Sequence, residues 1–411
     1  MIIRKTIENE MLECHRMSAL SFNWSLNAGD KTPEEYAAEH RPKEMPAPMP
    51  EVYGSWGAFT DDGQMMANLS VPDFQVAFDG QIVPMAGIGG VCTYPHHRRK
   101  GAVKGMFRQM MDGLYGEQVP FSYLYPFSEQ FYRSFGYGDG CGGIEWTFEL
   151  RGIPDFSYAG SFELHMPGAP IDDFDRVYGG FAAGLNMMIQ RTPKRGHHAA
   201  NADPFKDNAS AVLYRDAAGE PAGYVVFGRR VDPVLGPVLQ GAELAFDGFE
   251  TLRALMAFVK SYRSDYGYFT ITMPESMNLD FFCTDFAQTK TTKTIIKRGM
   301  VRAVHVEAVL KLARYRGDGA LSVFVRDAFL PGNTGRYEIE FADGRAKAVR
   351  FAPCESADCD IDMTINAFSS AILGAYDVAD FAYMDGVSIH ADADLVAKVF
   401  YKKPCFINNH F

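Results

Sequence analysis

Long apolar runs are missing from this sequence of 411 residues, and so is any excess of basic residues. No segment approaches the roughly 18 consecutive apolar residues of a membrane-spanning helix, and charged residues begin at position 4. We therefore expect neither a membrane span nor a signal peptide. The 40 Lys and Arg residues stand against 51 Asp and Glu, a net charge of −11. This balance argues against a protein that binds nucleic-acid phosphates with a basic face, and it favours cationic partners.

Cysteine is sparse and has no pattern that indicates a metal or a disulfide framework. The seven cysteines are scattered along the chain: Cys14, Cys92, Cys141, Cys283, Cys354, Cys359 and Cys405. Cys354 and Cys359 form the only close pair, and no second Cys or His pair lies nearby to complete a tetrahedral site. We expect reduced thiols, a cytoplasmic location and no bound metal.

Two common catalytic motifs are also absent. The sequence contains no Gly-x-x-x-x-Gly-Lys-Ser/Thr phosphate loop, and it contains no Gly-x-Ser-x-Gly nucleophile elbow. Neither a nucleoside-triphosphatase of the phosphate-loop type nor a serine hydrolase of the elbow type is therefore supported.

The length predicts two to four domains, and the hydrophobic pattern changes twice along the chain. The first block opens with apolar residues at helical spacing over residues 5–25, followed by a proline-rich stretch over residues 42–50. Short β-rich runs come next, and Asp62-Gly63 and Asp79-Gly80 separate them. Such dipeptides between β-rich runs predict antiparallel hairpins.

The second and third blocks begin near residues 150 and 300. The second repeats the order of the first loosely, with predicted helices over residues 172–190 and 250–262, but it has no basic turn. A degenerate internal duplication is therefore plausible. The third alternates strands and helices and ends with a predicted helix over residues 393–401.

The most informative segment is a glycine-rich strand that a basic turn joins to a helix. The strand, residues 85–93, contains three glycines, and Arg98-Arg99-Lys100-Gly101 precede the helix. The first turn of a helix has unpaired N–H groups and partial positive charge, so basic side chains beside it predict a diphosphate site. Glycines in the strand leave backbone groups accessible to an extended ligand arm. A solvated basic turn is the alternative, and His96 and His97 before it are interpreted as loop residues that face solvent.

This segment resembles the acetyl-CoA signature of the GNAT acetyltransferases, an Arg/Gln-x-x-Gly-x-Gly/Ala turn. Arg98 and Gly101 match its first two key positions, and Val103 stands where most members have Gly or Ala. A bulky residue there is typical of the branch of the Eis (enhanced intracellular survival) acetyltransferases. Residues 131–138, Phe-Tyr-Arg-Ser-Phe-Gly-Tyr-Gly, resemble that branch's Tyr-x-x-Phe-Gly-Tyr segment, and the sequence ends on the aromatic residue Phe411, as in that branch.

The resemblance implies an α+β fold with two tandem GNAT-fold domains, each a mixed sheet flanked by helices, and a final α+β domain like sterol carrier protein. It implies a catalytic GNAT domain over residues 1–150 and a degenerate GNAT-like domain over residues 151–297. Residues 298–411 then form the sterol-carrier-like domain, whose C-terminus enters the active site. A hexamer is also implied.

The resemblance further implies an N-acetyltransferase that moves an acetyl group from acetyl-CoA to a primary amine by direct attack. The α-carboxylate of Phe411 would be the general base, Tyr132 the general acid, and backbone N–H groups near Val91 the oxyanion donors. The residues implied to bind acetyl-CoA are Val91, Cys92, Thr93, Arg98, Arg99, Lys100, Gly101 and Ala102. From the pattern alone, Tyr132 could be a core aromatic residue and Phe411 part of a frayed tail.

Three residues are candidates for binding the acceptor: Phe22, Trp24 and His410. The acidic balance favours a cationic acceptor, which could be an aminoglycoside-like amine, a polyamine or the lysine of a peptide. His410 stands where the best-known Eis enzymes have an acidic residue, so the acceptor stays open. A protein that binds an apolar ligand such as a lipid or sterol in its last domain is the competing hypothesis, and the intact basic turn argues against it.

Overall fold

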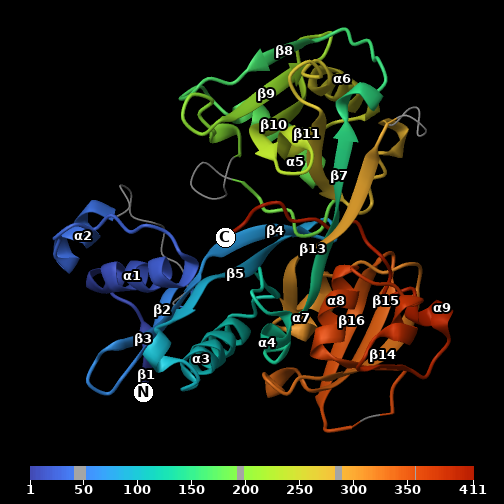
Figure 1. Ribbon diagram of the computed structural model, residues 1–411. Helices are drawn as coiled ribbons and strands as arrows, with labels where there is room; N and C mark the ends of the chain where they lie inside the picture. The colour runs from blue at the N-terminus through green and yellow to red at the C-terminus, as the bar shows by residue number, and fades with distance from the viewer. Residues whose placement is uncertain (41–51, 192–198, 283–288, 357) are drawn as a thin grey trace.

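The computed structural model describes residues 1–40, 52–191, 199–282, 289–356 and 358–411. The proline-rich stretch 42–50 and Cys283 lie outside them. Within the described residues, thirteen strands form one extended sheet, and five more form a second sheet (Figure 1). The architecture is α+β, as predicted, with helices packed on mixed sheets.

The first block supplies the strands and helices at one end of the large sheet. They are β1 (Ile2–Lys5), α1 (Met11–Phe22), α2 (Pro33–His40), β2 (Gly54–Phe59), β3 (Met65–Val71), β4 (Asp73–Phe78), β5 (Gln81–Thr93), α3 (Ala102–Gly116), β6 (Phe121–Leu124), α4 (Glu129–Arg133) and β7 (Gly138–Glu149). Both predicted hairpins are confirmed, because β2 pairs antiparallel with β3 and β4 pairs antiparallel with β5. At the second turn, Asp79 and Gly80 have φ angles of 49° and 79°, the left-handed pair of a type I′ turn.

The first helix is shorter than the predicted 5–25. Residues 2–5 form β1, which pairs with β2, and a 3₁₀ turn over Glu8–Glu10 precedes α1. The helix ends at Phe22 because Asn23 adopts a left-handed conformation, with a φ of 56°. Strand pairing and the asparagine cap therefore override the helical spacing at both ends of the predicted segment.

The second block repeats the order of elements in the first loosely, as strand, helix, strands, helix and strands. Its elements are β8 (Ser161–Leu164), α5 (Asp172–Ala182), β9 (Ala209–Arg215), β10 (Pro221–Asp232), β11 (Gly236–Phe246), α6 (Phe249–Lys260), β12 (Tyr268–Pro274) and β13 (Thr291–Ala303). In each block one helix connects two neighbouring parallel strands, α3 between β5 and β6 and α6 between β11 and β12. The helix predicted over residues 172–190 ends at Ala182.

The two blocks share strands at the centre of the sheet. Strand β13 pairs antiparallel with β7 along most of its length and with β6 at its end. The sequence boundary predicted between residues 297 and 298 therefore falls inside one continuous strand.

The third block forms the smaller sheet, in the order β16-β15-β14-β17-β18, and the helices on it. Its elements are α7 (Val306–Leu312), β14 (Gly319–Arg326), β15 (Gly335–Ala342), β16 (Arg345–Pro353), β17 (Ile361–Thr364), α8 (Ile365–Leu373), β18 (Val387–Ile389) and α9 (Ala393–Val396). The last helix is shorter than the predicted 393–401, although Val399 and Phe400 beyond it are buried.

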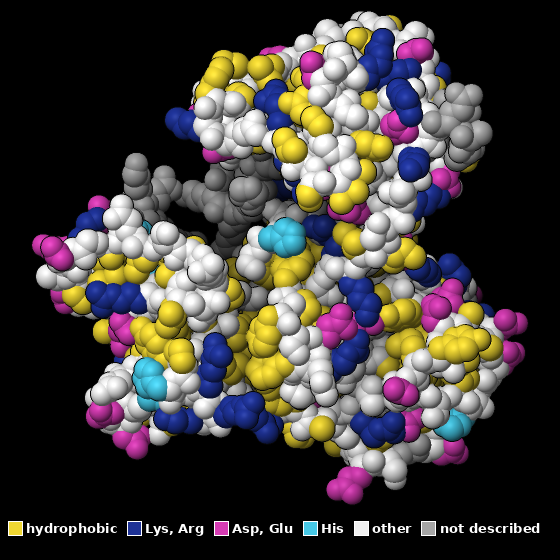
Figure 2. Space-filling view, viewed as in Figure 1, with side chains coloured by type: hydrophobic (Ala, Val, Ile, Leu, Met, Phe, Trp, Pro, Cys, Tyr) yellow, Lys and Arg dark blue, Asp and Glu magenta, His cyan; other side chains and the backbone are white. Residues whose placement is uncertain are grey.

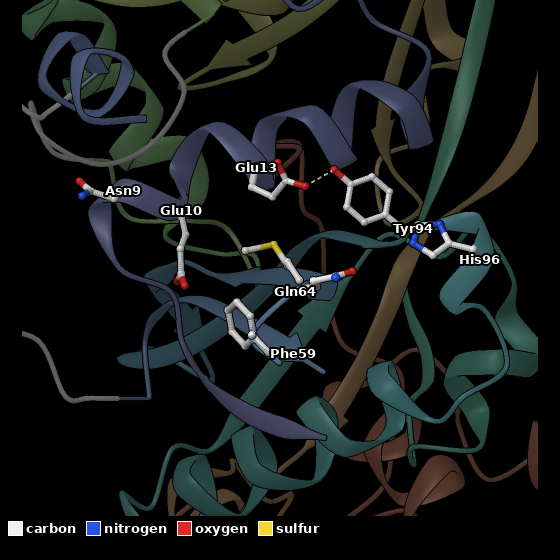
Figure 3. Close-up of a pocket in the computed structure, with 9 residues that line it drawn as sticks. Asn9, Glu10, Glu13, Phe59, Gln64, Tyr94 and His96 are labelled. Carbon is white, nitrogen blue, oxygen red and sulfur yellow. Dashed lines mark hydrogen bonds between the residues drawn. The ribbon is translucent and has the colours of Figure 1, made fainter. Parts of the chain in front are cut away.

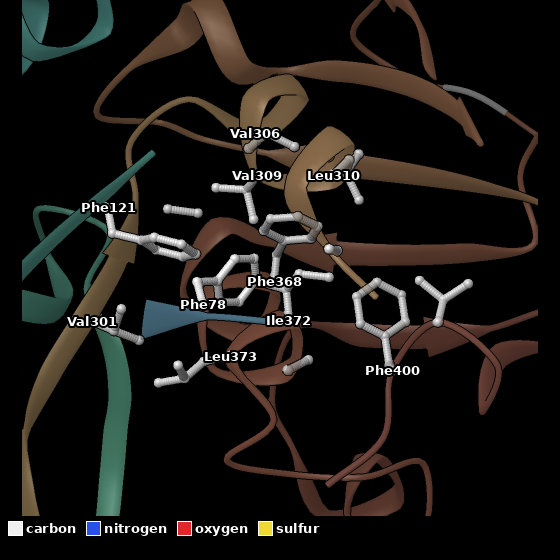
Figure 4. Packing of buried hydrophobic residues seen from close by; sticks show 14 of the residues in the cluster. Phe78, Phe121, Val301, Val306, Val309, Leu310, Phe368, Ile372, Leu373 and Phe400 are labelled. Carbon is white, nitrogen blue, oxygen red and sulfur yellow. The ribbon is translucent and has the colours of Figure 1, made fainter. Parts of the chain in front are cut away.

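The third block shares a hydrophobic core with the first (Figure 4). Phe78 at the end of β4 and Phe121 of β6 pack in one buried cluster with Phe368 and Ile372 of α8. This shared core fixes the third block against the sheet that carries the basic turn.

None of the helices in the described part of the chain combines the length and the apolar character needed to cross a bilayer. The same residues contain no group of three or more His, Cys, Asp and Glu side chains that could hold a metal ion.

Candidate active site

Strand β5 has a bulge where the glycine-rich segment ends. Gly89 pairs with Ser70 of β3, and Cys92 pairs with Asn68, so two residues of β5 lie opposite the single residue Leu69. Gly90 has a φ of 58°, which glycine adopts without strain. Because a bulge removes backbone groups from the ladder, it makes the N–H groups near residue 91 available to a ligand.

On its other edge, β5 separates from β6. The parallel pairing runs from Met85 to Ile88 and goes no further, so residues 89–93 lie beyond the last paired residue. Two parallel strands that diverge in this way leave a backbone edge with which an extended ligand arm can pair.

A pocket of about 860 Å³, here called the β5–α3 pocket, lies beside this edge. Its lining includes all eight residues predicted to bind acetyl-CoA: Val91, Cys92, Thr93, Arg98, Arg99, Lys100, Gly101 and Ala102. The lining also includes Ser21 and Phe22 of α1 and the aromatic residues Phe127 and Phe131. In Figure 2, hydrophobic side chains gather over α4, and Lys and Arg side chains lie beside them over α3.

The basic turn leads directly into α3. Gly101 is the N-cap of the helix with a φ of 82°, and a Cβ atom there would meet nothing within 4 Å, so an anion can approach its backbone closely. Within the described chain, none of Arg98, Arg99 and Lys100 forms an ion pair with a carboxylate. Free cations beside a helix N-terminus fit the pyrophosphate of the acetyl-CoA that the resemblance implies.

His97 also belongs to this pocket, although the sequence favoured a solvent-facing loop residue. Its side chain is buried, Nδ1 lies 3.3 Å from Nζ of Lys100, and Nε2 has no partner among the described residues. Burial, His96 and Lys100 lower the pKa of His97. A buried nitrogen without a partner is costly, and a phosphate group of the cofactor would satisfy it. His96 is exposed and lines a different pocket.

Tyr132 lies on α4 behind the aromatic wall of the pocket. It is 2% exposed, and its ring contacts those of Phe127 and Phe131, with centroids 5.4 and 5.1 Å away. The hydroxyl has no hydrogen-bond partner among the described residues, and burial alone raises its pKa above the ordinary value. The side chain is thus both a core aromatic residue and a protonated phenol near the pocket.

The C-terminal segment crosses from the third block to β5, and all three blocks hold it (Figure 1). In the second block, Asn186 N–H donates to the carbonyl of Pro404, and Phe406 N–H donates to that of Asn186, both at 2.9 Å. Arg298 of β13 donates from Nε to the carbonyl of Ile407 at 2.6 Å, and the hydroxyl of Tyr125 donates to that of Asn409.

The last residue ends against the glycines of β5. The ring of Phe411 packs on Phe74 and Tyr125, with centroids 4.7 and 5.4 Å apart. A Cβ atom at Gly89 would lie 3.1 Å from the carboxyl carbon of Phe411 and 3.1 Å from Oγ of Ser70. The terminal carboxylate therefore lies beside the bulge, which only a residue without a side chain at position 89 allows.

The three residues predicted to bind the acceptor amine lie in different parts of the structure. Phe22 lines the β5–α3 pocket and is half exposed, whereas Trp24 packs against His15 at 6.3 Å. His410 is exposed, its ring is tilted against that of Tyr125 with centroids 4.4 Å apart, and its Nε2 lies 3.4 Å from Arg298. Burial and Arg298 lower the pKa of His410.

Two further pockets lie against α1. The α1–β3 pocket, about 400 Å³, includes His15 and Ser18 of α1, Asn68 and Ser70 of β3, and Gly90 of β5. It therefore adjoins the β5–α3 pocket along β5, because Gly90 of the one precedes Val91 of the other.

The second of these pockets, the α1–Tyr94 pocket, has a volume of about 450 Å³. Figure 3 shows the carboxylate of Glu13 turned toward the hydroxyl of Tyr94, which donates to it at 2.5 Å. Glu10 accepts from Arg4 at 2.6 Å. Both carboxylates of this pocket, those of Glu10 and Glu13, therefore already accept hydrogen bonds from other side chains of the protein.

Comparison with known proteins shows two families. Residues 2–140 match the family described as acetyltransferase (GNAT) domain, and residues 306–407 match the sterol carrier protein domain. An uncharacterized N-acetyltransferase of Streptomyces coelicolor is 25% identical over 339 residues, 78% of this chain and 79% of the relative. N-acetyltransferase Eis of Mycobacterium tuberculosis is 24% identical, over 75% and 76% of the two chains.

Solved structures share the fold along the whole chain. A GCN5-related N-acetyltransferase from Anabaena variabilis superposes with a TM-score of 0.82 at 18% identity, covering 100% of both chains. Eis1 from Mycobacterium abscessus superposes with a TM-score of 0.77 at 18% identity, again over 100% of both.

Proposed function

Because the chain is an Eis-like acetyltransferase that joins a GNAT domain to a C-terminal sterol carrier protein domain, we propose that it transfers acetyl from acetyl-CoA to a primary amine by direct attack. One observation carries the proposal: the bulge of β5, the β5–α3 pocket and the carboxylate of Phe411 meet at residues 89–91. A donor, an acceptor and a base can therefore meet at one point of the strand.

Acetyl-CoA supplies the activated thioester. Arg98, Arg99 and Lys100 bind its pyrophosphate, and the backbone edge after Ile88 pairs with its extended arm. The backbone N–H groups at the bulge donate to the thioester oxygen as negative charge develops on it.

The amine loses its proton toward the carboxylate of Phe411. A terminal carboxylate has an ordinary pKa of about 3.3 to 3.7 and an alkylammonium one of about 10, so the carboxylate acts by orienting the amine and relaying the proton to water. As the new C–N bond forms and the C–S bond breaks, the hydroxyl of Tyr132 donates its proton to the leaving thiolate. Burial keeps that phenol protonated.

The proposal includes a cationic acceptor, such as an aminoglycoside-like amine, a polyamine or a lysine side chain, which the charge of −11 attracts. It also includes a cytoplasmic homo-oligomer, a hexamer, and a division into domains over 1–150, 151–297 and 298–411. The apolar-ligand alternative has less support, because Phe368, Ile372 and Phe400 fill the described core of the last domain.

The test adds one alanine after Phe411, which displaces the carboxylate without changing a side chain. Tyr132→Phe and Arg98→Ala test the acid and the pyrophosphate site, and CoA release is measured with a panel of amines. Phe411→Leu, which keeps the carboxylate, and Tyr158→Phe, at a tyrosine 48% exposed in the second block, are the matched controls.

We expect the extension to lower kcat at unchanged KM for acetyl-CoA, and Arg98→Ala to raise that KM by about tenfold to hundredfold. Full turnover in the extended protein would remove Phe411 from the mechanism. Failure of the native protein to bind acetyl-CoA would remove the enzyme proposal altogether.

A further inference from the structure

The side chains that line the α1–β3 pocket do not suit an acceptor with several positive charges. Its polar wall contains hydroxyl and amide groups from Ser18, Asn68 and Ser70. Among the described residues that line it, Glu8 is the only carboxylate, and its side chain is exposed. Several ammonium groups buried together need several carboxylates, because an unpaired buried charge is costly.

The neighbouring carboxylates of α1 and the turn before it do not supply that charge. Glu10 pairs with Arg4, and Glu13 accepts from Tyr94 and lies 3.6 Å from Arg16. Both line the α1–Tyr94 pocket, on the other side of the helix. The acidity of the whole chain is therefore not concentrated in the α1–β3 pocket.

His15 is the basic group of this pocket, and α2 orients it. Its Nδ1 lies 2.7 Å from the hydroxyl of Tyr36, a residue that is 3% exposed. Burial and the nearby ring of His40 lower the pKa of His15, so the imidazole is neutral at neutral pH. Its other nitrogen offers one hydrogen bond to a ligand.

The titratable groups around His15 are few. Tyr36 and His40 face it from α2, and the carboxylate of Glu8 lines the same pocket from the preceding turn. Cys14 lines the pocket from α1 itself, and burial raises the pKa of its thiol to about 11. His15 is therefore the group of this pocket whose charge changes on the acidic side of neutral pH.

We infer that the acceptor bound here is a small hydroxylated amine with a single amino group, of the amino-sugar or amino-alcohol class, with its hydroxyls on Ser18, Asn68 and Ser70. The pocket's volume, about 400 Å³, suits such a molecule, and Gly90 in its lining brings the amine to the bulge of β5. This inference rests on the proposed function, and it narrows the cationic acceptor proposed above to one with a single charge.

The test compares kcat/KM for glucosamine, spermidine and kanamycin at pH 8, above the ordinary histidine pKa of about 6.5. We expect glucosamine to exceed spermidine by at least about tenfold. His15→Glu adds a carboxylate to the pocket and should shift that ratio toward spermidine by about tenfold, whereas His96→Glu, in the α1–Tyr94 pocket, should not shift it. A native preference for spermidine or kanamycin overturns the inference.

The pH dependence gives a second readout. As pH falls through the lowered pKa of His15, its positive charge repels the ammonium group, so kcat/KM for glucosamine should fall, and His15→Gln should remove that fall. An unchanged acidic limb in His15→Gln contradicts the assignment.

Calorimetric titration of glucosamine into the protein separates the two proposals. Glucosamine binding that weakens as pH falls in the native protein but not in His15→Gln, without turnover of any amine, supports the pocket and overturns the transfer mechanism. Turnover of amines without the expected preference for glucosamine overturns the acceptor assigned to the pocket and leaves the transfer mechanism standing.

Discussion

Burial gives Tyr132 the property that a proton donor needs. Because the pKa of the phenol is raised above its ordinary value of about 10, the hydroxyl stays protonated throughout the usual assay range. The contacts of the Tyr132 ring with the rings of Phe127 and Phe131 place Tyr132 behind the wall of the β5–α3 pocket. The group therefore donates a proton readily only to a strongly basic neighbour such as a leaving thiolate.

We expect the kcat profile of the native protein to show no basic limb from this residue below about pH 10. Tyr132→Phe should lower kcat by about 10²-fold to 10⁴-fold at every pH, because it removes the donor. Steady-state rates between pH 6 and pH 10 check both statements. A fall above pH 8 in the native protein that Tyr132→Phe abolishes would contradict them.

Gly89 is the residue that leaves room for the terminal carboxylate. In Gly89→Ala the new Cβ would lie 3.1 Å from the carboxyl carbon of Phe411 and 3.3 Å from its oxygen, so the carboxylate must move. We expect kcat to fall by about tenfold to hundredfold with KM for acetyl-CoA unchanged. Gly116→Ala, at the end of α3 with nothing within 4 Å of the new atom, is the matched control. Equal kcat in both variants would show that the position of the carboxylate does not matter.

Among the elements, α4 depends on the third block for its position. The side-chain amide of Asn366 on α8 donates to the carbonyls of Arg133 and Tyr137 at 2.9 and 2.8 Å. Arg133 also pairs with Asp139 of β7 at 2.5 Å, and the hydroxyl of Tyr376 donates to the same carboxylate at 2.5 Å. These contacts hold the C-terminal end of the short helix that carries Tyr132 and the turn that follows it.

Asp139 should make this contact sensitive to acid. Burial raises the pKa of Asp139, but the hydroxyl of Tyr376 and the charges of Arg133 and Lys297 outweigh it and hold the pKa below its ordinary value. The folded state therefore favours the carboxylate, and its stabilisation is present above the unfolded pKa of about 3.9 and lost as pH falls through the folded value.

We expect Asp139→Asn to lower the free energy of unfolding by about 1 to 3 kcal/mol at pH 7. The difference from the native protein should shrink as pH falls below about 4, where the native carboxylate is protonated too. Urea denaturation of both proteins from pH 7 to pH 3 measures this difference in the free energy of unfolding. A difference that does not change with pH would mean that the charge of Asp139 has no part in the contact.

At the scale of the whole molecule, the turn after β4 joins the three blocks. Asp79 pairs with Lys403 at 2.7 Å, and both side chains are buried, with exposures of 5% and 3%. The same carboxylate accepts from the N–H of Arg314 at 2.6 Å and from the amide of Asn186 at 3.1 Å. Because Lys403 begins the segment that ends at Phe411, this ion pair determines where the C-terminal segment leaves the third block.

Asp79→Ala should destabilise the protein by about 3 to 5 kcal/mol, because it leaves the charge of Lys403 buried without its partner. It should also lower kcat, since the C-terminal segment loses its anchor. The double variant Asp79→Ala with Lys403→Met should recover part of the stability, because it removes the uncompensated charge. Denaturation and turnover are measured on the same samples.

Asp61→Ala provides the control for this prediction. Asp61 lies at the other hairpin turn, is 89% exposed and pairs with the N-terminus, so its loss should change stability by less than about 0.5 kcal/mol. Equal stability of Asp79→Ala and Asp61→Ala would contradict a structural role for the buried pair.

A site or turn whose residues lie within one short stretch of the chain could be predicted from the sequence. The glycine-rich strand, the basic turn and α3 are contiguous, so helix-terminus electrostatics were enough to predict a diphosphate site there, and the eight residues predicted to bind acetyl-CoA line one pocket. The hairpins at Asp62-Gly63 and Asp79-Gly80 were predictable for the same reason.

Contacts between distant residues depend on how the blocks pack, and no local pattern records that packing. Phe411 reaches Gly89, and Asn409 reaches Tyr125 across 284 positions, because the shared core of Phe78, Phe121 and Phe368 holds the third block against the first. His97 lines the β5–α3 pocket for the same reason, since its burial depends on neighbours and not on its loop sequence. Periodicity reports which face of an element is apolar, whereas the partner of that face is determined by packing over the whole chain.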